Sequence, residues 1–145
     1  MLKPASQALL AALFGLLVLA RPSAGTAGDD ETTVCALAAH PEHYSSQMVE
    51  VRAQVTSTST SLLLLYDSAC VRTPIALNIP HEIRQRADVY PLWRAIFREG
   101  GHLGTINKHI VATLSGQFMT AEGGGFLQNG MLTLHSVRHI YIKVD

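Results

Sequence analysis

The sequence predicts a mainly β domain with short helices, organised as a single unit. Apolar and polar residues alternate over residues 49–55, and the same period of two returns in residues 75–79 and 110–118. Between the last two stretches, residues 89–97 repeat apolar side chains with the period of a helix. A chain of 145 residues corresponds to one domain by length.

The first 27 residues have the three parts of a secretory signal peptide. Lys3 lies in the opening segment, an unbroken apolar run of thirteen residues follows, and a small and polar stretch completes the pattern. The apolar run is too short to span a bilayer comfortably. We therefore expect export to the periplasm or secretion, with cleavage after Ala27. A cut after Gly25 and an uncleaved anchor are the alternatives, and residues 28–145 form the domain, without a transmembrane segment.

The charge of the exported part argues against a nucleic-acid partner. Removal of residues 1–27 takes out Lys3 and Arg21, which leaves nine basic and eleven acidic residues and a net charge of about −2. General nucleic-acid binders are basic, because Lys and Arg neutralise the phosphates. No other charge-driven partner is implied.

Residues 35–55 organise the rest of the chain, since a short helix, a proline loop and a strand follow one another there. Thr32 or Thr33 can cap the helix, and Pro41 ends it because the residue before a proline avoids the helical region. Tyr44 then folds under the loop. One helical face contains Val34, Leu37 and Ala38. The strand, at residues 48–56, buries Val49, Val51, Ala53 and Val55.

Two further strands follow a polar turn at residues 57–61. Residues 62–67 return as an apolar strand and form a hairpin with the first strand. A short strand at residues 75–79 lies between Pro74 and Pro80, where a missing backbone donor is tolerated.

A core-facing helix is expected over residues 90–99, with Pro91 near its start and glycines beyond its end. Its apolar stripe contains Val89, Leu92, Trp93, Ile96 and Phe97. Because Trp93 lies inside this stripe, we expect its side chain to be buried against the sheet.

Two long strands complete the domain, at residues 109–118 and 131–143. The first has one face made of Ile110, Ala112, Leu114, Gly116 and Phe118. In the second, the inward positions Leu132 and Leu134 resume only at Ile140 and Ile142, so the alternation is interrupted near residues 136–138. This interruption predicts a bulge or a bend.

The order of three strands, a helix and two strands matches a five-stranded OB-like Greek-key barrel with a helix between strands 3 and 4. A different small α+β or sandwich domain is the alternative, because periodicity predicts elements better than topology. The sequence also resembles a pattern near the start of many small secreted bacterial OB-fold proteins, most of them without an assigned activity. The positions that carry this resemblance are Leu37, Pro41, Tyr44, Val49 and Val51. The resemblance implies the fold and no particular function.

Cys35 and Cys70 are the two cysteines of the chain, and both belong to the exported part. An even number of cysteines in an oxidising compartment usually pairs. We expect a disulfide that joins the first helix to the end of the second strand, with two reduced thiols as the alternative. No C-x-x-C spacing is present, so a redox-catalytic role is not indicated.

Seven histidines are the unusual feature of the composition. His40 and His43 flank a Pro-Glu pair, and imidazole and carboxylate groups in one loop are ligands for zinc or copper. No zinc-type spacing pairs this loop with a second cluster, and His135 and His139 would lie about 13 Å apart on a regular strand. We expect solvated or hydrogen-bonded histidines and no cofactor, with a metal site at His40 and His43 as the weaker alternative.

Ligand contacts are expected on the face of strands 2 and 3 and in the loops that join strands 1 to 2 and 4 to 5. Tyr66 is the aromatic residue of that face, and Phe126 borders the second loop. Four arginines concentrate before strand 4: Arg84, Arg86, Arg94 and Arg98. Arg94 and Arg98, one turn apart, either bind an anionic polymer or belong to a solvated helix face.

No local motif indicates catalysis, since no nucleophile with a base and no paired carboxylates were found. The sequence favours a non-catalytic binding or accessory module of the cell envelope, whose partner is an envelope protein or a small ligand. A periplasmic metal-binding protein that uses its histidines and an enzyme with a dispersed site are the alternatives.

Overall fold

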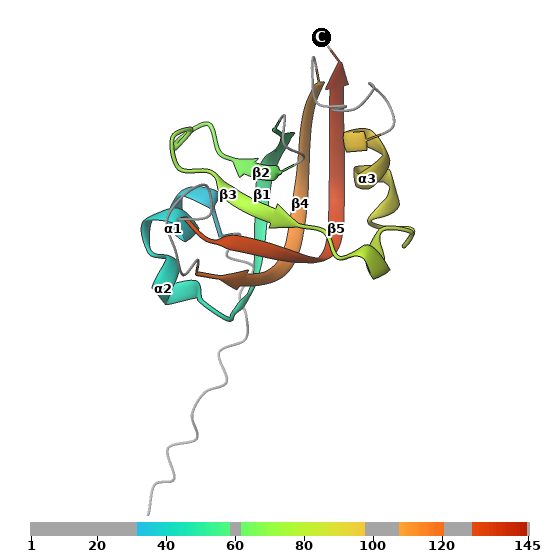
Figure 1. Cartoon of the computed structure of the whole chain (residues 1–145). Helices are drawn as coiled ribbons and strands as arrows, with labels where there is room; N and C mark the ends of the chain where they lie inside the picture. Colours follow the sequence, from blue (N-terminus) through green and yellow to red (C-terminus); the bar gives the residue numbers. More distant parts are fainter. Residues whose placement is uncertain (1–31, 59–61, 98–107, 121–128, 145) are drawn as a thin grey trace, which may run out of the picture.

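The computed structural model describes residues 32–58, 62–97, 108–120 and 129–144 (Figure 1). The expected signal peptide, its cleavage sites, Arg98 and Phe126 lie outside these ranges. Within them, the chain is mainly β, with five strands and short helices, as the sequence predicted.

Two short helices precede the sheet. Helix α1 (Val34–Ala39) begins at Thr33, whose hydroxyl accepts a hydrogen bond of 3.0 Å from the Ala36 N–H. The predicted proline loop is wrong, because the chain continues directly into a second helix, α2 (Pro41–Tyr44). A proline at the first helical position costs no hydrogen bond and already has a helical φ, so it ends one helix and starts the next. The last residue of α2 packs against the core, under this corner of the chain.

The five strands pair in a closed ring. They are β1 (Met48–Ser57), β2 (Leu63–Tyr66), β3 (Ile75–Asn78), β4 (Lys108–Met119) and β5 (Met131–Val144). The order around the ring is β1-β2-β3-β5-β4, and β4 returns to β1. All neighbours are antiparallel except β3 and β5, which are parallel. Every strand matches its predicted position to within one residue at each end, and the predicted hairpin of β1 and β2 is confirmed.

Alternate residues of the strands fill the interior of the ring. The inward positions predicted for β1 and β4 are all buried, and the most exposed of the apolar ones, Val49, has only 8% of its surface accessible. Helix α1 adds Val34 and Leu37, which are fully buried. Complete burial of a side chain of this size contributes about 1.5 to 3 kcal/mol, so this shared interior is the main source of stability.

Strand β5 bends because it carries two bulges. Its pairing with β4 shifts register twice, once after Ser115 and once before Thr113, and each time β5 contains one residue more than β4. The extra residues fall at His135 and beside His139, which has a left-handed φ of 50°. The inward face of β5 therefore consists of Leu132, Leu134, Val137 and Ile140. The predicted irregularity is confirmed, and Figure 1 shows β5 turning sharply between its two halves. The predicted inward position of Ile142 is wrong, because its side chain is exposed and does not pack against the core.

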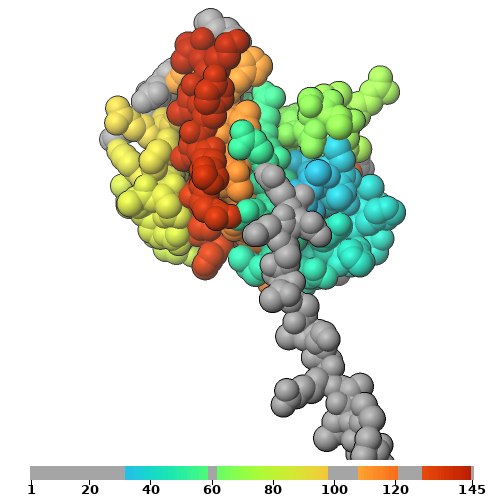
Figure 2. All heavy atoms as spheres, turned by 180° about the vertical axis from the view of Figure 1, so that it is seen from behind, coloured from blue at the N-terminus to red at the C-terminus, as the bar shows by residue number. Residues whose placement is uncertain are grey.

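Helix α3 (Tyr90–Phe97) lies between β3 and β4 in the chain, as predicted. Figure 2 shows β5 along one face of the molecule, with α3 on one side and β4 and β1 on the other. Leu92 and Ile96 are fully buried. The predicted burial of Trp93 is wrong in degree, because the ring contacts the core but stays half-buried at the end of the apolar stripe.

Asp88, in the turn before α3, attaches that turn to β5. Its carboxylate accepts two hydrogen bonds from Arg86, of 3.1 and 2.7 Å, and one of 3.4 Å from the Val137 N–H. Burial by itself raises the pKa of Asp88, but the hydrogen bonds from Arg86 and Val137 outweigh it and hold the pKa below its ordinary value of 3.8. The ionised carboxylate thereby covers part of the β5 edge that the short β3 leaves unpaired.

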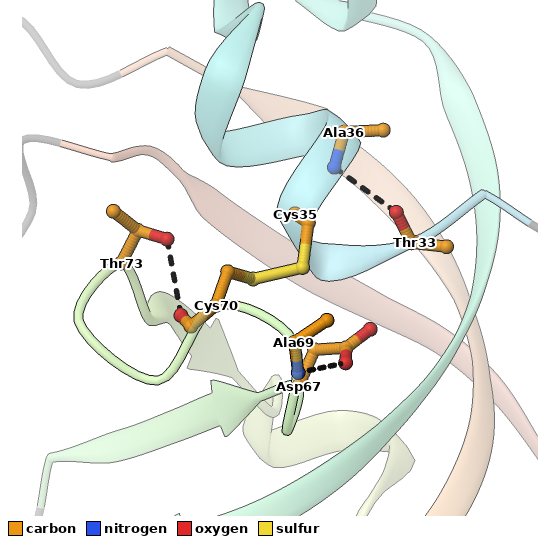
Figure 3. The surroundings of a disulfide bond; sticks show 7 residues. All are labelled: Thr33, Cys35, Ala36, Asp67, Ala69, Cys70 and Thr73. Carbon is orange, nitrogen blue, oxygen red and sulfur yellow. Dashed lines mark hydrogen bonds between the residues drawn. A yellow bond between two sulfur atoms is a disulfide. The ribbon is translucent and has the colours of Figure 1, made fainter.

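Cys35 in α1 and Cys70 in the turn after β2 form a disulfide, with their Cα atoms 5.6 Å apart (Figure 3). The predicted pairing is confirmed, and the separation lies within the usual range of about 4.4 to 6.8 Å. Two hydrogen bonds order the turn: Ala69 N–H donates to Asp67 Oδ1 at 2.9 Å, and the Thr73 hydroxyl donates to the Cys70 carbonyl at 3.1 Å.

None of the helices in the described ranges is long and apolar enough to cross a membrane. The disulfide is compatible with export.

Candidate functional site

One hollow lies on the outer face of the ring, over β1, β2 and the turn that follows β2. Its volume is about 370 Å³. The described residues that line it are Gln54, Thr56, Tyr66, Asp67, Ser68 and Val71. We refer to it as the Tyr66 hollow. It includes the end of β2, one of the two strands whose face the sequence predicted to contact a ligand.

Strand register brings polar groups of the Tyr66 hollow together. Gln54 pairs with Tyr66 across β1 and β2. Because the adjacent Val55 and Leu65 are buried in the core, both of these side chains face outward. The Gln54 side-chain nitrogen lies 3.3 Å from Nδ1 of His109 on β4. An aromatic ring, an amide and an imidazole therefore form a row across three strands.

The turn after β2 supplies the remaining wall of the hollow. Asp67 is held in place because it accepts the Ala69 N–H, and Val71 exposes 60% of its surface. The disulfide at Cys70 attaches this turn to α1, as Figure 3 shows. The wall thus combines hydroxyl, amide and carboxylate groups with one aromatic and one aliphatic side chain. None of the lining residues that the structure describes is basic.

A second hollow lies where β2 and β3 meet α3, and we refer to it as the Trp93 hollow. Its volume is about 260 Å³. The described residues that line it are Leu63, Leu77, Asn78, Ile79, Arg84, Trp93 and Phe97. The Arg84 guanidinium carbon lies 4.2 Å from the centre of the Trp93 ring, and the Phe97 ring centre is 4.1 Å from that of Trp93. The Arg84 cation and the two aromatic rings, whose planes are tilted by 38°, therefore lie next to one another along one wall.

The structure separates the residues that the sequence predicted to bind a ligand. Tyr66 lies in the first hollow. Arg94 is exposed on α3 and lines neither hollow. Sequence reasoning missed Gln54, Asn78 and the pairing of Arg84 with Trp93. The period of two does indicate that Gln54 faces outward, but the partners of these residues depend on strand register and on the path of the turns.

The histidines are spread over the surface. His40 precedes α2 and its Nδ1 lies 4.0 Å from Glu42 Oε1, while the His43 ring meets the Tyr44 ring edge to face at 5.0 Å. His135 is exposed at the first bulge of β5. In the parts of the chain that the structure describes, no group of three or more His, Cys, Asp or Glu side chains is arranged to hold a metal ion.

Glu50 forms the centre of a polar cluster on the outer face of β1, β4 and β5. Its carboxylate pairs with Arg138 and accepts a hydrogen bond of 2.9 Å from the Ser115 hydroxyl. The hydrogen bond from Arg138, followed by that from Ser115, holds the pKa of Glu50 below its ordinary value of 4.5. The cluster links three adjacent strands and belongs to neither hollow.

We expect the free energy of unfolding of Glu50→Gln to fall less in acid than that of the unmodified protein. Since the pKa of Glu50 is lower in the folded than in the unfolded chain, its contribution is complete above about pH 4.5 and disappears as the pH falls through the lowered value. Because the Glu50 side chain is 36% exposed, the substitution should lower the free energy of unfolding at pH 7 by less than about 1 kcal/mol. Urea unfolding at several pH values measures this effect. Glu42→Gln, on the exposed face of α2, is the control, and equal acid dependence of both variants would contradict the assignment.

No family model matches this chain, and neither a curated protein nor a solved structure is significantly similar to it. The functional argument therefore depends on the geometry and chemistry of the two hollows.

Proposed function

We propose that this chain is an exported, non-catalytic OB-like binding module of the cell envelope, and that its ligand binds in the Tyr66 hollow. The closed order of five strands, the parallel pairing of β3 with β5 and the position of α3 between β3 and β4 support the OB-like assignment. The disulfide and the apolar run near the N-terminus support export.

The position of the Tyr66 hollow is the observation that carries the proposal. OB barrels bind ligands on the face of strands 2 and 3 and in the loops that join strands 1 to 2 and 4 to 5. The Tyr66 hollow shares strand 2 with that face, while its other walls come from β1 and from the turn after β2. The hollow has Tyr66 from β2 in its wall, and Thr56 lies near the end of β1. With about 370 Å³, its volume falls within the range of small-molecule sites, roughly 300 to 1,000 Å³.

The chemistry of the hollow favours a neutral saccharide over a nucleic acid, the two ligand classes that this barrel type commonly binds. Asp67 is the charged residue among its described lining, and a carboxylate repels phosphates. The Gln54 amide and the hydroxyls of Thr56 and Ser68 provide donors and acceptors for sugar hydroxyls. Tyr66 provides an apolar ring with a polar tip, which suits a ring that is apolar on its face and polar at its rim.

The test is titration with a tetramer of N-acetylglucosamine, followed by nuclear magnetic resonance of the ¹⁵N-labelled protein. We expect the largest shifts at the Gln54 side-chain amide and at the backbone of Thr56, Tyr66 and Ser68. Tyr66→Ala should weaken binding about tenfold, at the low end of what loss of an aromatic stacking platform costs.

Tyr141→Ala is the matched control, because Tyr141 is 59% exposed on β5 and does not line the hollow. Its affinity for the tetramer should equal that of the unmodified protein. Saturable binding of a dodecamer of thymidylate at physiological salt, with no shifts from the sugar, would reject the saccharide assignment. Shifts that avoid the hollow altogether would reject the site.

A further inference from the structure

The Trp93 hollow has an apolar floor that reaches into the core. Leu63, Leu77 and Ile79 belong to the buried core and are exposed by 5% or less. Trp93 and Phe97 form one wall above this floor, and both are half-buried. An apolar side chain placed in the hollow would therefore lose contact with water and gain contact with two aromatic rings.

Arg84 provides an unpaired positive charge at the rim of this hollow. It donates from Nε to the Ile79 carbonyl at 3.2 Å, which holds the guanidinium over the Trp93 ring and leaves the other N–H groups for a ligand. Among the residues that the structure describes, no carboxylate pairs with Arg84. In contrast, Arg86 and Arg138 both have acidic partners. The guanidinium is thus held in place by the protein while its charge is not neutralised by an ion pair.

We propose that the Trp93 hollow binds the C-terminal residue of a peptide or partner protein when that residue is apolar and carries a free carboxylate. The apolar side chain occupies the floor, and the carboxylate accepts hydrogen bonds from Arg84, a geometry for which guanidinium groups are well suited. The site is separate from the Tyr66 hollow, since Leu63 begins β2 and Tyr66 ends it. It therefore adds a second binding activity to the one proposed above.

Two features favour a peptide end over an aliphatic acid. Asn78 is exposed and lines the hollow, and its side-chain amide matches the donor and acceptor of a peptide bond, which an aliphatic acid lacks. The hollow, at about 260 Å³, is also smaller than the sites that hold drug-sized molecules. This volume suits one side chain with its carboxylate and not a long acyl chain.

The chain offers a direct probe, because Trp93 is its single tryptophan. The experiment titrates the full-length protein with acetyl-Gly-Gly-Leu that has a free C-terminal carboxylate, and follows the intrinsic fluorescence. We expect a saturable change in emission. The same peptide with a C-terminal amide should bind at least about tenfold more weakly, because it lacks the charge that Arg84 recognises.

Arg84→Gln should weaken binding of the free acid by about tenfold and abolish the preference over the amide. Arg52→Gln is the matched control, since Arg52 is exposed on β1 and lines neither hollow. It should leave both affinities unchanged. If Arg84→Gln does not fold, the comparison of acid with amide on the unmodified protein still decides the role of the charge. Asn78→Ala, an exposed substitution, then tests the site.

Equal affinity for the acid and the amide would overturn the proposal, as would the absence of any saturable change. Titration with octanoate tests whether the site recognises the carboxylate of an aliphatic acid or that of a peptide end. If octanoate binds as tightly as the peptide and depends on Arg84, the site recognises aliphatic acids and the peptide assignment is wrong. The N-acetylglucosamine tetramer should leave the Trp93 emission unchanged, so failure at one hollow does not imply failure at the other.

Discussion

Replacing both cysteines by serine should lower the free energy of unfolding by about 3 to 4 kcal/mol. The disulfide closes a loop of about 36 residues. Cross-linking a loop of that length lowers the conformational entropy of the unfolded chain and thereby stabilises the folded state by about this amount. Small domains have a total stability of about 5 to 15 kcal/mol, so the loss is a large fraction of it. Urea unfolding of the Cys35→Ser/Cys70→Ser variant measures it.

Ala69→Ser is the control for the effect of a hydroxyl in the same turn, because Ala69 is exposed one residue before Cys70. Its stability should lie within about 0.5 kcal/mol of the unmodified protein. Reductant added to the unmodified protein should reproduce the loss seen in the double variant. A change below about 1 kcal/mol in the double variant would mean that the cross-link does not restrict the unfolded chain as expected.

Phe118→Ala should cost about 3 to 5 kcal/mol, the range for a buried phenylalanine truncated to alanine. Phe118 points inward from β4 and has no accessible surface. Its ring packs against Gly130, where a Cβ atom would collide with it and where φ is 97°. Position 130 therefore requires glycine, both for space and for its positive φ. Since Gly130 has no side chain, it cannot fill the cavity that removal of the Phe118 ring would leave.

Met119→Ala provides the comparison at the next position of the same strand. Met119 faces outward and is 38% exposed, so its truncation should cost less than about 1 kcal/mol. Equilibrium unfolding of both variants in urea gives the difference. Similar costs at the two positions would contradict the assignment of inward and outward faces on β4.

The strands could be predicted closely because their signal is local. A period of two in residues 48–56 follows directly from one buried and one solvated face, and the observed β1 exceeds that range by one residue. The interruption of the alternation in β5 also appears in the sequence, because each bulge reverses the parity of the side chains after it: the first turns Val137 inward and the second returns Ile140 to the original parity. The pairing of Cys35 with Cys70 followed from their number and compartment.

The candidate sites could not be predicted to the same degree, because they depend on contacts between elements. Gln54 lies beside Tyr66 only in the observed register of the β1 and β2 hairpin. Arg84 reaches Trp93 because a short 3₁₀ helix, His81–Ile83, and the following turn bring residues nine positions apart together. A helical stripe likewise indicates which residues face the core, but not where neighbouring elements end and leave a gap. Trp93 faces such a gap.

Neighbouring strands of the ring are paired over unequal lengths, and we call each such pairing a seam. The short seams are where binding of a ligand should change the stability of the ring most. Strand β3 is held by three residue pairs to β2 and three to β5, whereas β4 has eight pairs with β1 and eleven with β5. The three pairs between β3 and β5 join residues as far apart as Ala76 and Met131, so they close a long stretch of chain, and we expect the ring to open there more readily than along β4. The Trp93 hollow has walls from β2, β3 and α3, and α3 also contacts β5, so a ligand in the hollow would lie beside this seam. A peptide end bound at the proposed Trp93 site would add contacts beside this short seam, and we expect slower exchange of the amide protons of β3 and β5 when the site is occupied.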